Sequence, residues 1–173
     1  MLKEWIEKYP QQHNIVLEYI KCLGRLSFIQ NAEEAKQTIN NMKELVEKYS
    51  DNIEIALIYS DILQHLSFIQ QDVEEINQTI QYLKELAEKY PNENDIIFNY
   101  ATSLFNLSVE QQEVEKVKQT TQYLKGLAEK YPKHEYVVLV YVKSLVNLAF
   151  DQKEMKERKQ TVQYLKELAE KYA

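Results

Sequence analysis

Residues that favour tight turns are scarce in this chain, which has only 2 glycines and 3 prolines among its 173 residues. All-β folds need many tight turns, so this scarcity favours long helices. The chain also lacks a run of about 18 apolar residues, and we therefore expect no membrane-spanning helix and no membrane partner. The N-terminal residues lack the apolar segment of a secretory signal peptide.

Cysteine is also scarce, because Cys22 is the only one in the sequence. One cysteine excludes an intramolecular disulfide and suits a reducing compartment. We therefore expect a cytoplasmic protein. Basic residues are outnumbered, with 21 Lys and Arg against 27 Asp and Glu, for a net charge of −6. Lysines and glutamates alternate along the chain without forming a basic stripe, so nucleic acid is not an expected partner.

The residue types that carry catalysis do not cluster in the sequence. His13, His65 and His134 show no metal-ligand spacing. Gly24 and Gly126 are isolated, so no glycine-rich phosphate loop is present. The glutamates are interpreted as a solvated surface rather than as acids with raised pKa values. We expect a non-enzymatic protein without a metal or cofactor.

One phrase of nine residues recurs five times. Its closing tyrosines, separated by 40 or 41 residues, are Tyr9, Tyr49, Tyr90, Tyr131 and Tyr172. The same spacing recurs in a second tyrosine column at Tyr19, Tyr59, Tyr100 and Tyr141, and in leucine columns at Leu23, Leu63, Leu104, Leu145 and at Leu26, Leu66, Leu107, Leu148. The first repeat is one residue shorter after Gln30, at a predicted turn. A fixed period of this size indicates stacked helical units.

The pattern within each repeat predicts two helices of about 17 residues, joined by short polar turns and antiparallel to each other. Pro10, Pro91 and Pro132 follow the second helix and stop it. The prediction is one all-α domain over residues 1–173, with a partial helix at 1–10 and repeats at 11–50, 51–91, 92–132 and 133–173.

Two other recurring positions receive a structural interpretation. Cys22 falls in a column with Ile62, Ser103 and Ser144, so we interpret it as a buried thiol rather than a nucleophile. We expect the threonine column to let helices approach closely and the glutamine column before it to satisfy backbone groups of the turns. These columns are Thr38, Thr79, Thr120, Thr161 and Gln37, Gln78, Gln119, Gln160.

The repeat resembles the tetratricopeptide repeat family. Counting back from Pro132, the residues Leu127, Leu124 and Thr120 match the family's packing positions in the second helix, Leu107–Ser108 matches its Leu–Gly pair, and Leu104 occupies its tryptophan position. The unit here has 41 residues rather than the family's 34. The resemblance implies a right-handed α-solenoid, a superhelix of antiparallel hairpins whose first helices line a concave groove that binds peptides or protein segments.

By this resemblance, a row of residues beside the core face of each first helix faces the groove. The candidate peptide-binding residues in these rows are Lys21, Phe28, Asp61, Gln64, Phe68, Phe98, Thr102, Phe105, Val109, Lys143, Val146 and Phe150. The ends of each row stay apolar, whereas the middle changes from repeat to repeat. The Phe column either lines the groove or packs at the helix turn, and the variable middle reflects either ligand specificity or neutral drift. Because Phe105 and Val146 lie at its centre, an amphipathic helix or apolar peptide is the expected ligand.

The ends of the array leave two further functions open. Solenoids usually need polar end caps. Trp5 replaces a recurring leucine near the N-terminus, and Arg158 replaces the apolar column of Ala35, Ile76 and Val117. The second helix nevertheless keeps its apolar face to the last residue. The alternatives to a binding scaffold are therefore a structural module that stacks end to end as a homo-oligomer, or a piece of a longer array.

Overall fold

Residues 13–172 form eight α-helices and no strand in the computed structural model, which describes this part of the chain. The helices are α2 (His13–Ser27), α3 (Ala32–Lys48), α4 (Ile53–Ile69), α5 (Val73–Lys89), α6 (Asn94–Glu110), α7 (Val114–Lys130), α8 (Glu135–Asp151) and α9 (Met155–Tyr172). The predicted all-α class is confirmed, and six of the eight helices have the expected 17 residues. The predicted partial helix at 1–10, with Trp5 and Pro10, lies outside the described residues.

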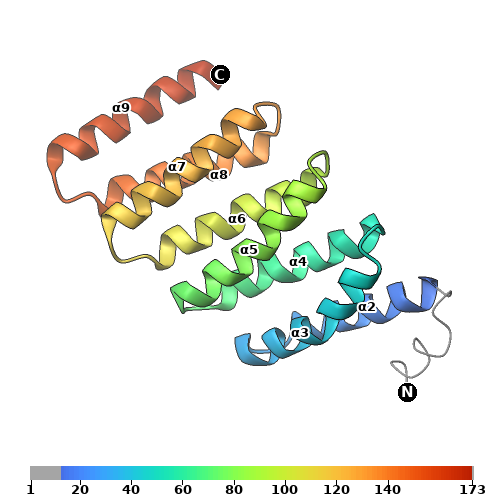
Figure 1. The fold of residues 1–173 in the computed structure, drawn as a ribbon. Helices are drawn as coiled ribbons and strands as arrows, with labels where there is room; N and C mark the ends of the chain where they lie inside the picture. The colour runs from blue at the N-terminus through green and yellow to red at the C-terminus, as the bar shows by residue number, and fades with distance from the viewer. Residues whose placement is uncertain (1–12, 173) are drawn as a thin grey trace.

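The eight helices pack in chain order as four antiparallel hairpins, with α2 and α9 at opposite ends of the row (Figure 1). We call the first helix of each hairpin (α2, α4, α6, α8) an A helix and the second (α3, α5, α7, α9) a B helix. Neighbouring A helices contact each other; α4, α6 and α8 each contact both adjoining B helices, and α2 contacts α3. Among the described residues, no two B helices come into backbone contact. This succession is consistent with a helical repeat protein.

The helix ends follow from local residue choices. Asn52 caps α4 by accepting hydrogen bonds from the backbone N–H groups of Glu54 (3.0 Å) and Ile55 (3.3 Å). Asp72 caps α5 in the same way, at 2.9 Å from the N–H of Glu75. Such caps satisfy N–H groups that have no partner inside the helix. The B helices end at the tyrosine column, and Pro91 directly follows Tyr90, so the predicted proline stop is confirmed.

The recurring leucines form the core between the hairpins. Leu63, Leu83 and Leu124 are fully buried, and Leu104 and Leu145 are nearly so. Tyr59 and Tyr141 of the second tyrosine column are buried as well. Burial of large apolar side chains is the main favourable term in folding. The packing assignment of these columns is therefore confirmed in the central and C-terminal repeats.

The first repeat departs from this pattern. Cys22 is exposed, so its interpretation as a buried thiol is wrong, and Leu26 is exposed where Leu66 and Leu107 are buried. The position of Cys22 faces the preceding A helix in the other repeats, where Ile62 and Ser103 are buried. Among the described residues, no A helix precedes α2. Within the described part of the chain, no helix therefore covers this column at α2, and Cys22 is exposed.

A side-chain hydrogen bond closes every hairpin. The Oγ1 atoms of the threonine column donate to the Oε1 atoms of glutamines at the turn between the A and B helices, at 2.8–3.0 Å. The pairs are Thr38–Gln30, Thr79–Gln70, Thr120–Gln111 and Thr161–Gln152. The glutamine column that sequence reasoning assigned to the turns (Gln37, Gln78, Gln119, Gln160) is exposed instead. The turn is closed by the glutamine that ends the A helix.

The one-residue deletion of the first repeat falls in the turn between α2 and α3, as the sequence predicted. Gln70 follows α4 directly and continues its hydrogen-bonding pattern to Leu66 at 3.0 Å. Gln30 lies instead in a turn after α2, with its N–H donating to the carbonyl of Ser27. The bond to Thr38 spans eight residues rather than nine and keeps its length of 2.8 Å. The deletion thus shortens the helix end and preserves the hydrogen bond.

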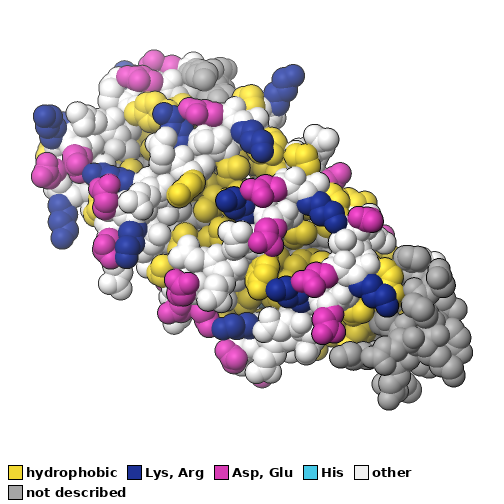
Figure 2. Space-filling model, viewed as in Figure 1, with side chains coloured by type: hydrophobic (Ala, Val, Ile, Leu, Met, Phe, Trp, Pro, Cys, Tyr) yellow, Lys and Arg dark blue, Asp and Glu magenta, His cyan; other side chains and the backbone are white. Residues whose placement is uncertain are grey.

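Long charged side chains join the B helices, whose backbones are apart. Lys36 pairs with Glu75 between α3 and α5, and Lys118 pairs with Glu157 at 3.1 Å between α7 and α9. Lysines and carboxylates alternate over the face in Figure 2, with hydrophobic side chains visible between them. The face that the B helices present is a solvated one.

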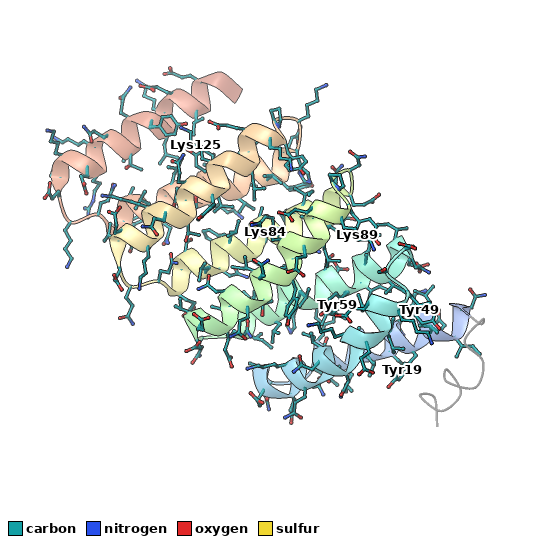
Figure 3. The ribbon with its side chains drawn as sticks, in the orientation of Figure 1. Tyr19, Tyr49, Tyr59, Lys84, Lys89 and Lys125 are labelled. Carbon is teal, nitrogen blue, oxygen red and sulfur yellow. The ribbon has the colours of Figure 1, made fainter. Side chains whose placement is uncertain are left out.

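The charged residues of the recurring phrase lie on this surface. Lys84 and Lys89 project from α5 (Figure 3). Lys84 pairs with Glu88 on the same helix at 3.9 Å, and Lys89 reaches Asp51 at 3.5 Å. Exposed pairs of this kind contribute little to stability. Within the described residues no helix is long and apolar enough to span a membrane.

Candidate functional site

The twelve candidate residues all belong to the A helices, except Phe28, which directly follows α2. Together with Leu17, Gly24, Leu57 and Leu139 they form four parallel rows, one on each A helix. We call this surface the A face. The rows come close together because neighbouring A helices contact each other directly. Each row has an apolar start, a variable middle and an apolar end.

The end of each row is an exposed apolar edge. Phe68 is 70% exposed, Val109 53% and Phe150 78%. Phe28 is half exposed and lies against His65 of the next A helix, with 4.7 Å between the ring centroids. Of the two interpretations of this column, packing therefore describes Phe28, whereas Phe68 and Phe150 expose most of their surface. Large apolar side chains gathered in this way mark interaction surfaces more often than stability elements.

The start of each row is more covered. Phe98 on α6 is half-buried, and its ring centroid lies 5.7 Å from that of Tyr136 on α8. The two rings line a hollow of about 470 Å³, which also contacts Asp95, His134 and Glu135. Tyr136 is a residue that sequence reasoning missed. One feature of the sequence distinguishes Tyr136, because it lies outside every tyrosine column of the repeat.

Polar contacts hold two of the eight middle positions. Lys21 bridges to Glu54 of α4 at 2.9 Å and to Glu18 at 3.1 Å, and these bonds raise the pKa of its ammonium group. Asp61 accepts a hydrogen bond from Nδ2 of Asn99 on α6 at 2.7 Å. Lys21 and Asp61 therefore help to position neighbouring A helices.

The environment of Asp61 disfavours its charge. Partial burial at the contact between α4 and α6 raises the pKa of its carboxyl group, and the charge of Asp95 adds to this effect. The hydrogen bond from Asn99 acts in the opposite direction but is weaker than the burial. A carboxylate that is poorly compensated in this way favours a cationic or donor group from a ligand.

The other middle positions lack such contacts. Lys143 is exposed and has no side-chain partner among the described residues. Oγ1 of Thr102 is buried and also has no hydrogen-bond partner in this part of the chain. Gln64 and Phe105 are half-buried, and Val146 is exposed. The A face between α6 and α8 therefore has the polar and apolar groups that are least occupied by internal contacts.

Gly24 does not belong to the exposed part of the A face. It is buried, and a Cβ atom at this position would lie 3.0 Å from Cδ1 of Ile62 and 3.4 Å from Cγ2 of Ile58. The equivalent Gln64, Phe105 and Val146 are all more exposed. Gly24 thus serves the close approach of α2 to α4, and the first row offers a ligand less surface than the others.

The described titratable groups form no catalytic cluster. Within residues 13–172, no three His, Cys, Asp or Glu residues are arranged to hold a metal ion. Burial raises the pKa values of Tyr59, Tyr100 and Tyr141 and lowers that of His65, so each of these groups is held in its neutral form at pH 7. Neutral phenols and a neutral imidazole at packed positions have the properties of core residues.

The chain matches no family model, no curated protein and no solved structure. The assignment of function therefore depends on the geometry of the A face and of the surfaces around it.

Proposed function

We propose that this chain is a non-enzymatic scaffold, a right-handed tetratricopeptide-like solenoid that binds an amphipathic helix or apolar peptide segment on its A face. The observation that carries the proposal is the exposed apolar edge of Phe68, Val109 and Phe150 on three successive A helices. Helix-in-groove recognition uses such spaced apolar anchors.

The packing of the helices supports a concave A face. Neighbouring A helices contact each other, whereas the B helices are held apart and are joined by long side chains such as Lys118 and Glu157. A row of hairpins with its A helices closer together than its B helices curves toward the A helices. This curvature would bring the apolar ends of the four rows around a bound segment.

The middle of the A face suggests the polarity of the ligand. Asp61 on α4 and Lys143 on α8 lie on either side of Thr102 on α6. A segment that crosses the A helices would meet the carboxylate of Asp61 and then the ammonium group of Lys143. We expect a ligand with a basic residue near Asp61 and an acidic residue near Lys143, because opposite charges across an interface set its register.

A displayed library of helical peptides tests this function. Peptides selected against the chain should lose most of their affinity when Phe68 and Val109 are both replaced by glutamate. Both side chains are exposed, so the substitutions should leave the helical content and melting temperature nearly unchanged. The matched control is Val162→Glu on α9, which has the same exposure as Val109 (54% and 53%) but lies off the A face. Peptides that bind the double variant as well as the original chain would refute the A face as the site.

A structural module that stacks end to end is the second candidate function. It requires two complementary ends. The side of α2 that faces away from α4, which we call its outward row, carries the exposed residues Glu18, Cys22 and Arg25. These residues are poorly suited to an apolar contact. Light scattering over a concentration series distinguishes the two functions, since a monomer at high concentration would exclude stacking.

A further inference from the structure

The last hairpin has an apolar groove on the side away from α7. A hollow of about 330 Å³ lies between α8 and α9, beside Pro132 and Glu135. Its apolar lining, which we call the end groove, consists of Val138, Leu139, Val142, Leu165, Leu168 and Ala169. The end groove is distinct from the exposed edge of Phe68 and Val109 that carries the proposed function.

In the earlier repeats, the same columns are covered by the next A helix. α6 packs against α4 and α5, and α8 packs against α6 and α7. Ala101 and Ala128 are buried in the third repeat, whereas the equivalent Val142 and Ala169 are half-buried and exposed. Val162, three residues before Leu165 on α9, is likewise 54% exposed although its equivalent, Thr121, is 4% exposed. The end groove thus repeats a helix-binding surface, and no helix among the described residues covers it.

The polar flank of α9 also repeats an internal interface. Lys36 reaches Glu75, and Lys118 reaches Glu157, one repeat further along the chain. Lys159 occupies the same column on α9 and has no partner among the described residues. In these two of the three internal interfaces, the carboxylate comes from the start of the helix that follows the docked A helix, whereas Asn77 and Lys116 occupy the equivalent positions between α5 and α7. The end groove therefore favours a helix followed by an acidic segment.

A second copy of this chain is a poor match for the end groove. The α4 helix presents Ile58 and Ile62 toward α2, and α6 presents Asn99 and Ser103 toward α4. The equivalent residues on α2 are Glu18 and Cys22, and Glu18 would bring a charge into the apolar contact. The outward row of α2 thus lacks the pattern that fills the internal grooves.

We propose that the end groove binds an amphipathic helix of another polypeptide, one with the apolar pattern of α4 and an acidic segment after it. The occupant is inferred from continuity with the internal interfaces, where α4 fills the groove of α2 and α3 while Glu75 pairs with Lys36. The helices α8 and α9 form a groove of the same kind, and Lys159 occupies the position beside it that Lys36 occupies beside the groove of α2 and α3. The end groove shares Leu139 with the A face but includes none of the exposed edge of Phe68, Val109 and Phe150.

A synthetic peptide of residues 51–75 is the probe, because it contains α4 and ends at Glu75. Titrated against the 173-residue chain with a fluorescent label, it should bind saturably. Val162→Glu should weaken binding about tenfold or more, since a charge would enter the apolar contact. Val109→Glu is the matched control with equal exposure and should leave the affinity unchanged. Lys159→Glu should also weaken binding, by repulsion of the acidic end.

Three results would overturn the proposal. The first is an absence of saturable binding, and the second is binding that Val109→Glu weakens while Val162→Glu does not. The third is a dimer, seen by sedimentation equilibrium, that Val162→Glu dissociates while the peptide fails to bind. That last result would assign the end groove to a second copy. Circular dichroism of each variant establishes that it is folded, and the A-face peptides should bind Val162→Glu normally, which separates the two sites.

Discussion

Oγ1 of Thr79 donates a hydrogen bond of 3.0 Å to Oε1 of Gln70, which joins the second turn of α5 to the end of α4 across the turn between them. The same pair recurs in all four hairpins, with the length kept between 2.8 and 3.0 Å. Gln70 and Thr79 are both buried. A hydrogen bond between buried side chains fixes the angle at which the two helices leave the turn, because neither group has water as an alternative partner.

Removal of this hydrogen bond should destabilise the chain. Thr79→Val keeps the shape of the side chain but leaves the buried Oε1 of Gln70 unpaired, at a cost of about 1–3 kcal/mol in the free energy of unfolding. The matched control is Thr102→Val, because Oγ1 of Thr102 has no hydrogen-bond partner within the described residues. Urea denaturation of both variants measures the difference. Equal stabilities would show that the Gln–Thr pair contributes nothing.

The leucine columns were predictable from the sequence, whereas the Gln–Thr pairs were not. Periodicity identifies positions that face the core, and Leu63, Leu104 and Leu145 are buried as expected. The partner of each threonine lies in a turn eight or nine residues earlier, beyond the spacing that helical periodicity can relate. Sequence reasoning instead assigned the adjacent glutamines of the B helices to the backbone groups of the turns, and these glutamines are exposed.

The exposure of Cys22 illustrates a second limit of prediction from repeats. A repeat pattern treats every unit as equivalent, but within residues 13–172 the first and last hairpins each contact only one other hairpin. Cys22 at one end, and Val162 and Ala169 at the other, are exposed although their columns are buried elsewhere. On the A face, the rows were predicted by spacing, but the bond of Lys21 to Glu54 joins separate repeats and could only come from the structure.

The core assignment can be tested at Leu104. This side chain is buried in the core, and Leu104→Ala should lower the free energy of unfolding by about 2–5 kcal/mol through the lost apolar contacts and the cavity left behind. Phe150→Ala removes a larger side chain that is 78% exposed, and should change stability by less than about 0.5 kcal/mol. Thermal and urea denaturation measure both. The reverse order would contradict the assignment of core and A face.

The two glycines should respond differently to alanine. Gly126 lies within α7, and no neighbouring side chain comes within 4 Å of the place that a Cβ atom would take, so Gly126→Ala should stabilise the chain by about 0.5–1 kcal/mol through helix propensity. Gly24→Ala gains the same propensity but places Cβ 3.0 Å from Cδ1 of Ile62. The flexible end of Ile62 must move, so Gly24→Ala should stabilise the chain less than Gly126→Ala does, or should destabilise it. Thermal denaturation measures the melting temperature of both variants. A larger increase for Gly24→Ala than for Gly126→Ala would contradict the close approach of α2 and α4.

Asp61 should make stability depend on pH. Its pKa is raised above the ordinary value of 3.8 by partial burial, so the folded state binds a proton more tightly than the unfolded state. The free energy of unfolding therefore falls as the pH rises from the unfolded pKa through the folded one. Asp61→Asn keeps an oxygen that can accept from Asn99 and removes the charge. Its melting temperature should exceed that of the original chain at pH 7, and the difference should shrink below about pH 4. No difference at pH 7 would refute the effect.

Photocrosslinking of a selected peptide tests the central claim, binding on the A face, most directly. A photoreactive amino acid would replace Gln64 on the A face of α4 in one variant and the exposed Gln81 on the B helix α5 in another. Mass spectrometry of the irradiated complex then measures which variant becomes joined to the peptide. We expect crosslinks from position 64 and none above background from position 81. Crosslinks from position 81 alone would place the ligand on the B helices and contradict the account.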